Sequence, residues 1–465
     1  MPSQPDLTPW PATEVEKYRA LGYWTGETLG QLLSARATAT PDAIAVVDDR
    51  HSWTYAELET RARSLATGFL ELGVRPGDRV LVQLPNIAEF VEVIFGLCYA
   101  GALPVLCLPT HRRSELEPIA QVSGAVAIVA RHHHQRFNHA TLGAILREHA
   151  PALRHLIIVP DQPGAALPGG TRALDELRAA PRELPQVDAS DIAFLQLSDD
   201  SIPRLIPRTH DDYLYSVRRS AELCELDNTS VYLAALPVAH NFAMGSPGIL
   251  GALFAGGTVA LAIDPSPTTA FSAIERFSVT ITALEPPLAK RWVERAEAST
   301  KYDLSSLRVL LLGGATCPDE LARRIRSALG ATLQQVFGLA EGLVCRTRLD
   351  DPAEVVPATQ GRPMSAHDQV AVVDEAGHHV PPGTDGLLIT KGPYTIRGYY
   401  RNPEANASSF TEDGWYRTGE VVNLRADGNL VVKGRRGDRD GEKISIEAIE
   451  AHLLEAAATR TAIVT

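Results

Sequence analysis

The sequence predicts an α/β protein with two doubly wound lobes, a small β-rich subdomain and a truncated C-terminal α+β domain. Short apolar strands alternate with amphipathic helices up to about residue 340, a pattern typical of parallel sheets covered by helices on both faces. After Glu341 the pattern changes to short strands separated by Gly and Pro turns, which indicates the β-rich subdomain. The length of 465 residues also exceeds that of one simple domain.

Local signals predict each element of the first lobe. Thr54 is expected to cap a helix with apolar residues at helical spacing. The expected elements are a helix near Leu29–Ala39, a strand over Ala43–Asp48, a helix through Tyr55–Leu72, a strand over Arg79–Leu84, a helix over Ile87–Ala100 and a strand over Ala102–Leu108.

The second half of the chain contains a connection, the β-rich subdomain and a hinge. Residues 161–190 are rich in Pro and Gly and predict a surface connection. The expected short strands are Asp368–Asp374, Gly386–Lys391 and Leu430–Lys433. We therefore place a large N-terminal domain at 1–433, with its β-rich part at about 345–433. The hinge and the start of an incomplete C-terminal domain fall at 434–465.

Composition excludes several classes of function. Lys and Arg number 44 against 56 Asp and Glu, a net charge of −12 that disfavours a nucleic-acid partner. The apolar stretches are far shorter than the ~20 residues that a membrane helix needs, and no signal peptide is visible. The 5 cysteines are scattered without metal-binding spacing. These features predict a cytoplasmic protein with reduced thiols.

One stretch, residues 195–210, occupies the position of a phosphate loop. It follows an apolar strand at Ile192–Leu197 and precedes a helix expected from Asp211. Such a loop aims backbone N–H groups at an anion. Here Asp199 and Asp200 add two negative charges, and each unpaired contact with a phosphate at ~4 Å costs about 1 kcal/mol even in water. The alternative is an ordinary acidic turn that caps the next element.

A second candidate site is the polar and aromatic cluster at residues 239–246. It lies between an apolar strand, Tyr232–Leu236, and a helix expected to start near Pro247. Open α/β sheets bind ligands at the carboxyl ends of their strands. The cluster is therefore a candidate binding site for a small molecule.

Five ordered segments carry a family resemblance: LIPRTHDDY at 205–213, VYLAALPVAHNFAMGSPG at 231–248, TLQQVFGLAEGLV at 332–344, GPYTIRGYY at 392–400 and SFTEDGWYRTG at 409–419. Together they resemble the adenylate-forming superfamily, and most closely the stand-alone 2,3-dihydroxybenzoate–AMP and salicylate–AMP ligases of siderophore and non-ribosomal peptide biosynthesis. The resemblance implies a ligase that uses ATP and Mg²⁺ to form an aryl-adenylate. It also implies transfer of the aryl group to the phosphopantetheine of an aryl carrier protein, and it leaves a homodimer open.

The resemblance assigns the acid-binding residues. His240 would gate the site near the substrate carboxylate, as one of two candidate catalytic residues. The implied substrate contacts are Asn241 to an ortho-hydroxyl, Phe242 to the ring face, Ser246 beside the 3-position, and Gly314 and Val336. Glu285 stands where relatives carry a small apolar residue. A carboxylate pointing inward there is unfavourable for an anionic substrate.

The resemblance also assigns the nucleotide side. Glu341 would be the Mg²⁺ carboxylate, Asp438 the hinge pivot and Lys443 the second candidate catalytic residue. The implied nucleotide-binding residues are Ser198, Ser201, Arg204, Gly313, Ala315, Phe337, Gly338, Glu420 and Arg435. Glu420 replaces the family's aspartate, which binds both ribose hydroxyls.

Several features depart from the family pattern. The phosphate loop and the hinge are shorter, and the lysine near the far end of the family's C-terminal domain has no counterpart. One explanation is a non-catalytic pseudo-ligase that binds an aryl acid or docks to a peptide-synthetase assembly line. The other is an incomplete sequence, although omitted residues would not account for Asp199, Asp200 or Glu420. A third hypothesis is a different acyl-transfer or an ATP-independent reaction that uses the same site and His240.

Overall fold

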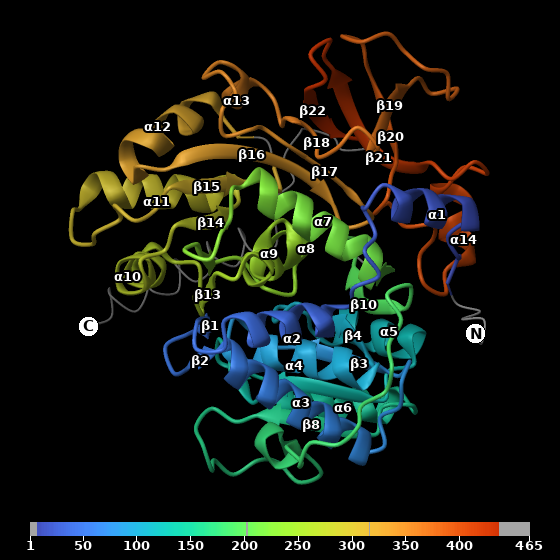
Figure 1. The fold of residues 1–465 in the computed structure, drawn as a ribbon, viewed down its shortest axis with the longest axis vertical. Coiled ribbons are helices and arrows are strands. Elements are labelled where there is room, and N and C mark those ends of the chain that lie inside the picture. The colour runs from blue at the N-terminus through green and yellow to red at the C-terminus, as the bar shows by residue number, and fades with distance from the viewer. Residues whose placement is uncertain (1–6, 201–202, 316, 437–465) are drawn as a thin grey trace.

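The computed structural model describes residues 7–200, 203–315 and 317–436 (Figure 1). These residues form a seven-stranded sheet, a nine-stranded sheet, a four-stranded sheet and a two-stranded hairpin. Most pairings in the two large sheets are parallel, and strands alternate with helices along the chain. The expected α/β architecture with two large lobes and a small β-rich part is confirmed.

The seven-stranded sheet forms the lower lobe in Figure 1 and has helices on both faces. Leu81 packs with the α5 and α6 side, whereas its neighbours Val80 and Val82 belong to the core that contains α3 and α4. Its strand order is β11 (Leu205–Thr209), β10 (Ile192–Leu197), β4 (Leu103–Leu106), β3 (Arg79–Gln83), β5 (Ala127–Arg131), β8 (His155–Val159) and β9 (Arg172–Ala173). The helices of this lobe are α3 (Tyr55–Glu71), α4 (Ala88–Ala100), α5 (Arg113–Ser123) and α6 (His139–His149).

The nine-stranded sheet forms the second lobe. Its order is β18 (Arg362–Pro363), β17 (Leu343–Arg346), β16 (Thr332–Leu339), β15 (Val309–Leu312), β14 (Ile281–Leu284), β12 (Val231–Ala234), β13 (Thr258–Leu261), β1 (Ile44–Val47) and β2 (Ser52–Thr54). Its helices are α7 (His210–Leu223), α8 (Asn241–Gly245), α9 (Gly248–Ala255), α10 (Pro267–Phe277), α11 (Pro286–Ala298), α12 (Asp319–Leu329) and α13 (Val355–Ala358). Helix α2 (Leu29–Ala39) contacts α3 and α4 of the lower lobe as well as α9.

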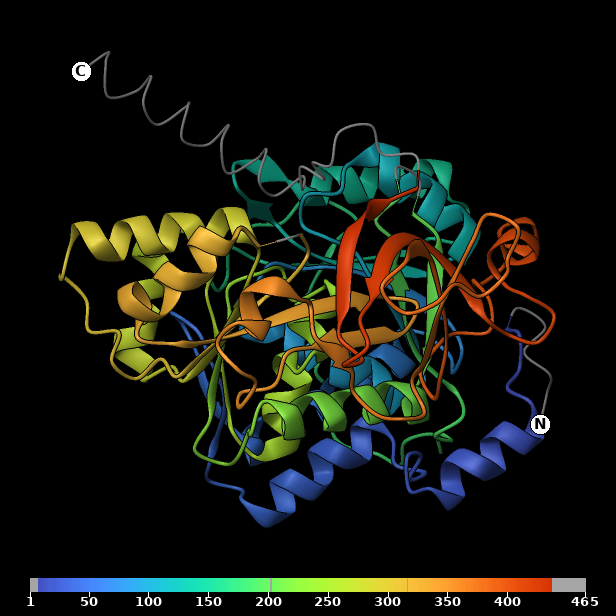
Figure 2. The same ribbon diagram turned by 90° about the horizontal axis from the view of Figure 1, so that it is seen from above.

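The four-stranded antiparallel sheet stands beside the nine-stranded sheet, on the same side of the lower lobe, and faces the viewer in Figure 2. It runs in sequence order through β19 (Gln369–Val373), β20 (Asp385–Lys391), β21 (Tyr416–Leu424) and β22 (Leu430–Arg435). The remaining elements are α1 (Ala12–Ala20), the hairpin β6 (His133–His134) and β7 (Phe137–Asn138), a 3-10 turn at Leu174–Leu177, and α14 (Pro403–Ser409).

Capping explains where helix α3 begins. The Thr54 side chain accepts a hydrogen bond from the Glu57 backbone N–H, and the Glu57 carboxylate accepts one from the Thr54 N–H at 2.8 Å. This reciprocal box satisfies two donors that a helix start otherwise leaves unpaired. The predicted cap is confirmed, and the helix ends one residue before the predicted boundary.

The phosphate-loop region differs from the prediction. The sequence led from the loop straight to a helix, but residues 205–209 form strand β11, which pairs antiparallel with β10 in the register Leu197↔Leu205. Leu205 and Ile206 are buried, which favours a strand. Pro207 is tolerated because β11 lies at the edge of its sheet. Strands β10 and β11 are therefore antiparallel neighbours, and the described residues 198–200 and 203–204 lie between them.

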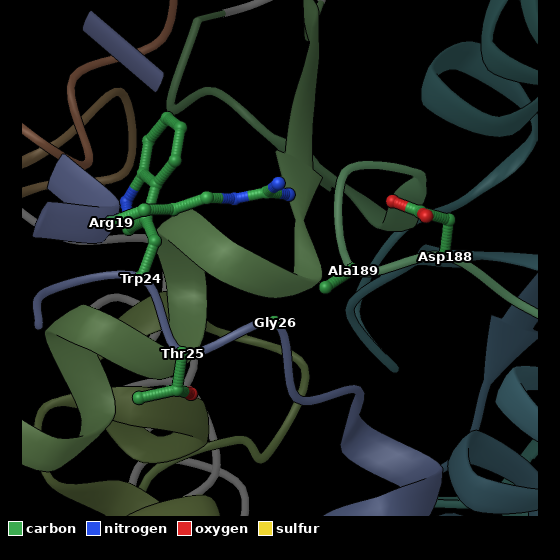
Figure 3. A pocket seen from close by; sticks show the side chains of 6 residues that line it. All are labelled: Arg19, Trp24, Thr25, Gly26, Asp188 and Ala189. Carbon is green, nitrogen blue, oxygen red and sulfur yellow. The ribbon is translucent and has the colours of Figure 1, made fainter. Parts of the chain in front are cut away.

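The segment between α1 and α2 ties the N-terminal end to the body of the protein. The Gly26 N–H donates to Asp211 Oδ1 at 3.0 Å, and Arg19 lies 3.4 Å from Asp211 Oδ2. A cavity of about 380 Å³ opens beside this segment (Figure 3). It is lined by Arg19, Trp24, Thr25, Gly26, Asp188 and Ala189. Within the described ranges, no helix is long and apolar enough to cross a membrane.

Candidate active site

The loop between β10 and β11 is held together by its own side chains. Ser198 Oγ donates to Asp200 Oδ2 at 2.6 Å and accepts from the Arg204 backbone N–H at 2.9 Å. The guanidinium of Arg204 binds the same Asp200 oxygen, through Nε at 2.8 Å and Nη2 at 2.7 Å. Asp200 therefore binds the guanidinium of Arg204, the cation that the resemblance assigns to the nucleotide. Ser201 lies outside the described residues.

Arg204 is connected to the candidate metal ligand, Glu341, through the side chain of Tyr399. Its guanidinium carbon lies 4.2 Å from the centre of the Tyr399 ring, a cation–π arrangement. The Tyr399 hydroxyl donates to Glu341 Oε1 at 2.9 Å and lies 3.1 Å from the Tyr416 hydroxyl. Burial, followed by the Glu341 charge, raises the pKa of Tyr399 above its usual value. The phenol thus stays protonated and donates to the carboxylate.

A glycine turn fixes Glu341 at this position. The Glu341 carbonyl accepts from the Ile396 N–H at 2.8 Å. The next residue, Gly342, has φ of +109°, and a β-carbon there would lie 1.8 Å from the Tyr394 carbonyl oxygen. Any other residue at 342 would push these two segments apart. Glu341 is buried, and the glycine turn that follows it holds the carboxylate in place.

The acid side centres on Asn241, the first residue of α8. Its Oδ1 accepts from Gln196 Nε2 and from the Tyr213 hydroxyl, both at 2.9 Å. His240 caps the helix, because its Nδ1 accepts from the Phe242 backbone N–H at 3.2 Å. These bonds orient the Asn241 amide group and fix the direction of the His240 ring.

Phe242, Val336 and the two glycines after β15 lie together. A β-carbon at Gly313 would lie 3.1 Å from the Phe242 ring and 2.8 Å from the Val336 carbonyl oxygen. One at Gly314 would lie 3.1 Å from Glu285 Oε1. The glycines therefore let an aromatic ring, a strand and a carboxylate approach one another. The Glu285 side chain therefore lies close to the backbone at Gly314.

The buried side chain of Arg346 holds the backbone at Ser246. The Ser246 carbonyl accepts from Arg346 Nη2 at 3.2 Å, and the same nitrogen lies 3.2 Å from Ser220 Oγ. Nη1 of Arg346 contacts Cys224 Sγ at 2.7 Å, and both Arg346 and Cys224 are buried. Burial raises the pKa of the Cys224 thiol, although the guanidinium works in the opposite direction. The sequence did not point to Arg346.

Glu420 and Arg435, both assigned to the ribose, are neighbours in the four-stranded sheet. They pair across β21 and β22, with Arg435 Nε 3.9 Å from Glu420 Oε1. The Glu420 N–H donates to Thr418 Oγ1 at 3.0 Å. The two residues thus form one charged pair at the end of the sheet.

The structure brings most of the assigned residues into two groups. One joins the loop to Glu341 through Tyr399, and the other joins Asn241 and Phe242 to the glycines. His240 Nε2 and Asp199 Oδ1, 4.0 Å apart, connect the groups. Of the remaining assigned residues, Phe337 and Gly338 pair with β17, and Ala315 follows the two glycines. Asp438 and Lys443 lie outside the described residues.

Four contacting residues had no assigned role before the structure was described: Gln196, Tyr213, Tyr399 and Tyr416. Tyr213, Tyr399 and Tyr416 lie within the segments that carry the family resemblance, whereas Gln196 lies in the apolar strand that precedes the first segment. The segments were visible in the sequence, whereas the long-range contacts were not.

In the part of the chain that the structure describes, two other clusters have donors that are close enough to share a cation: His132, His133 and Asp161, and Asp48, His51 and Glu89. Arginines already neutralise both, because Arg131 lies 3.8 Å from Asp161 and Arg50 lies 2.7 Å from Glu89. Neither cluster includes an assigned residue, and neither does the cavity beside α1. We therefore restrict the candidate active site to the two groups.

Comparison with known proteins defines the class. The structure resembles that of MbtA from Mycobacterium smegmatis with a TM-score of 0.86 at 46% identity, covering 97% of this chain and 84% of that one. The fold is that of an adenylate-forming protein. A model described as AMP-binding enzyme matches residues 33–400, and the chain belongs to this family.

Curated relatives are similar over almost the whole chain. A 2,3-dihydroxybenzoate-AMP ligase of Bacillus subtilis is 52% identical over 453 residues, which is 96% of this chain and 83% of the relative. A vibriobactin-specific 2,3-dihydroxybenzoate-AMP ligase of Vibrio cholerae is 46% identical, covering 97% and 83%. A salicylyl-CoA synthase / salicylate adenylyltransferase of a Streptomyces species is 45% identical, covering 96% and 82%.

Proposed function

We propose that this protein is an aryl-acid–AMP ligase that activates 2,3-dihydroxybenzoate or a salicylate-like acid with ATP. The product is an aryl-adenylate, and an aryl carrier protein takes the aryl group on its phosphopantetheine thiol. The observation that carries the proposal is the position of loop 198–204 between two groups, the acid side at Asn241 and the metal side at Glu341. The names of the relatives agree with this chemistry.

On the acid side, the ring lies along Phe242 and the two glycines, and Ser246 adjoins its edge. The side-chain oxygen of Asn241, Oδ1, accepts hydrogen bonds from Gln196 and Tyr213. The side-chain nitrogen, Nδ2, is therefore the atom that contacts an ortho-hydroxyl of the substrate. His240 caps the start of α8, and its Nε2 lies 4.0 Å from Asp199 Oδ1 of the loop, which supports a role for His240 between the substrate carboxylate and the phosphates. Gln196 and Tyr213 position Asn241.

On the nucleotide side, the residues present are compatible with Mg²⁺. Glu341 offers a carboxylate oxygen, and Mg²⁺ usually takes one or two carboxylates together with waters and substrate phosphates. The metal would neutralise phosphate charge as the acid oxygen attacks the α-phosphorus and pyrophosphate leaves. Tyr399 orients Glu341, and the Glu420–Arg435 pair meets the ribose.

The loop side chains, as the structure shows them, oppose this reaction. Asp200 binds Arg204 through two nitrogens, so an incoming phosphate must displace a carboxylate before it reaches the guanidinium. This contact favours a second candidate function, a pseudo-ligase that binds an aryl acid or docks to an assembly line without activating the acid.

Pyrophosphate exchange with a panel of hydroxybenzoates separates the two functions. The ligase gives exchange that depends on both the acid and Mg²⁺, well above a control without acid. The pseudo-ligase gives only background exchange but still binds an aryl acid in calorimetry. Absence of both exchange and acid binding would rule out the two functions together.

A further inference from the structure

Two histidines and one aspartate meet where strands β5 and β8 end. The two strands are parallel neighbours in the register Arg131↔Val159, so the residues that follow them leave the sheet side by side. The His132 N–H donates to the Val159 carbonyl at 2.9 Å, and the His133 N–H donates to Asp161 Oδ1 at 3.1 Å. Backbone hydrogen bonds therefore set the positions of the two histidines beside Asp161.

Both imidazoles approach the same oxygen atom of Asp161. Nδ1 of His133 lies 2.8 Å from Asp161 Oδ2, and Nδ1 of His132 lies 3.7 Å from it. The centres of the two rings are 4.0 Å apart, and the donor atoms of all three residues lie within 4.8 Å of one another. A hydrogen bond accounts for the position of His133, but His132 is too far from the oxygen for one. A cation shared by the three groups accounts for both.

The spacing of these donor atoms suits a transition-metal ion. Zn²⁺ lies about 2.0–2.1 Å from a histidine nitrogen and about 2.0–2.2 Å from a carboxylate oxygen, so two donors on one tetrahedral ion are about 3.3–3.4 Å apart. The observed separations of 2.8 and 3.7 Å lie on either side of that value. Two imidazoles and one carboxylate form a donor set that proteins use for such ions, with a remaining position for water. Mg²⁺ prefers oxygen donors.

The cluster is accessible to a cation from solvent. The side chains of His133 and Asp161 are 44% and 37% exposed, and that of His132 is 13% exposed. Arg131 lies 3.8 Å from Asp161, but its contact is with the other oxygen, Oδ1. The arginine charge therefore weakens the attraction for a cation without occupying the donor atom that the histidines face. We expect an affinity in the micromolar range.

The next histidine along the chain, His134, does not belong to the cluster. It follows His133 in the short strand β6, and successive residues of a strand face opposite sides. His134 pairs with Phe137 across the hairpin, and its ring lies 6.5 Å from that of His139. A change at His134 thus alters the same run of histidines without removing one of the three donors.

We propose that His132, His133 and Asp161 form a binding site for a divalent transition-metal ion such as Zn²⁺, Ni²⁺ or Co²⁺. The ligands are Nδ1 of each histidine and Oδ2 of the aspartate, and the ion ties the end of β5 to the end of β8. The site includes none of the residues assigned to the aryl acid or to the nucleotide. It is therefore independent of the proposed function.

The test is calorimetry of the full chain, without a histidine tag, against ZnCl₂ in a buffer that contains millimolar Mg²⁺. One ion per chain is expected to bind with micromolar affinity, and Zn²⁺ should raise the temperature of thermal unfolding because it binds the folded arrangement. His132→Gln, His133→Gln and Asp161→Asn should each weaken binding at least about tenfold. The visible absorption of bound Co²⁺ should be lost in the same variants.

Two controls keep a histidine change but spare the cluster. His134→Gln lies in the same run, and His378→Gln removes an exposed histidine that lies 3.3 Å from Asp374, a pair of one histidine with one aspartate. Both should bind Zn²⁺ as the wild type does. Thermal unfolding without metal should show that every variant is folded.

The second cluster that could hold an ion among the described residues contains His51, which makes His51→Gln the variant that separates the two. Zn²⁺ binding that is lost in His51→Gln or His134→Gln overturns the proposal. Unchanged binding in His133→Gln and Asp161→Asn, or no binding by the wild type, overturns it as well. Pyrophosphate exchange is not part of this readout, so the proposed function stands or falls separately.

Discussion

The hydroxyl of Tyr399 donates a hydrogen bond to Glu341 at 2.9 Å, although the two residues are 58 positions apart in the chain. The bond fixes the rotamer of the carboxylate assigned to Mg²⁺. Residues that orient a metal ligand typically affect metal affinity 10–100-fold when they are removed. Tyr399 is therefore a positioning residue, and its effect should appear in the metal dependence of the reaction.

Tyr399→Phe keeps the ring that stacks on Arg204 and removes only the hydroxyl. We expect the Mg²⁺ concentration for half-maximal pyrophosphate exchange to rise about tenfold, with a smaller change in the KM for the aryl acid. Tyr416→Phe is the control, because its hydroxyl meets Tyr399 and not Glu341. Equal Mg²⁺ dependence in all three proteins would contradict the assigned role.

Asp200→Asn should tighten nucleotide binding. The change removes the charge that neutralises Arg204 and leaves the side-chain volume almost unchanged. We expect the Kd for ATP, measured by calorimetry, to fall about tenfold, and the effect to shrink at high salt. Asp319→Asn is the matched control, since Asp319 also precedes an arginine by four residues but is exposed on α12. Weaker or unchanged ATP binding would show that the Asp200 charge does not compete with phosphate.

Glu420→Gln tests the assignment of Glu420 to the ribose hydroxyls of ATP. A charged hydrogen bond to a ribose hydroxyl is worth about 1.5–3 kcal/mol. The wild type should therefore bind ATP at least tenfold more tightly than 2′-deoxy-ATP, and the variant should discriminate less. The comparison of two nucleotides within each protein cancels any general loss of stability. Unchanged discrimination would place Glu420 away from the ribose.

His210 should make the protein sensitive to acid. Burial lowers the pKa of His210 from its usual 6.5 to about 4, and its Nδ1 accepts from the Leu29 backbone N–H at 3.2 Å. Between pH 6.5 and 4 the unfolded chain binds a proton that the folded protein rejects. Stability is thus lost as the pH falls through this window, by about 3 kcal/mol for this group.

His210→Gln retains an acceptor for Leu29 and does not titrate. Denaturant unfolding should show a shallower fall in stability between pH 6.5 and 4 for this variant. His378→Gln serves as the control, because His378 is exposed on a turn. A slope equal to that of the wild type would mean that folding does not lower the pKa of His210.

Local signals in the sequence were sufficient for many elements. Thr54 and Glu57 predicted the start of α3 because a capping box depends only on residues three positions apart. The strand at Ile192–Leu197 was predicted with its observed bounds because its apolar run is buried on both faces. The family resemblance assigned Asn241 and Glu341 from contiguous segments, and these assignments stay predictions.

Other features depend on contacts that no local pattern contains. Strand β11 was missed because Pro207 argues against a strand unless the sheet edge is known. The acidic loop was expected to meet phosphate with unpaired charge, but Asp200 turns back onto Arg204. That ion pair forms only because the hairpin brings residues 198 and 204 into register.

Arg346 holds residue 246 through the main-chain carbonyl and leaves the serine side chain out of the bond. A change of side chain at 246 therefore keeps the anchor, and the backbone path into α9 stays where it is. Because Ser246 is buried, small replacements are the ones that this anchor accommodates. The proposed ring contact makes position 246 the place where a library of small residues aimed at new ring substituents should begin.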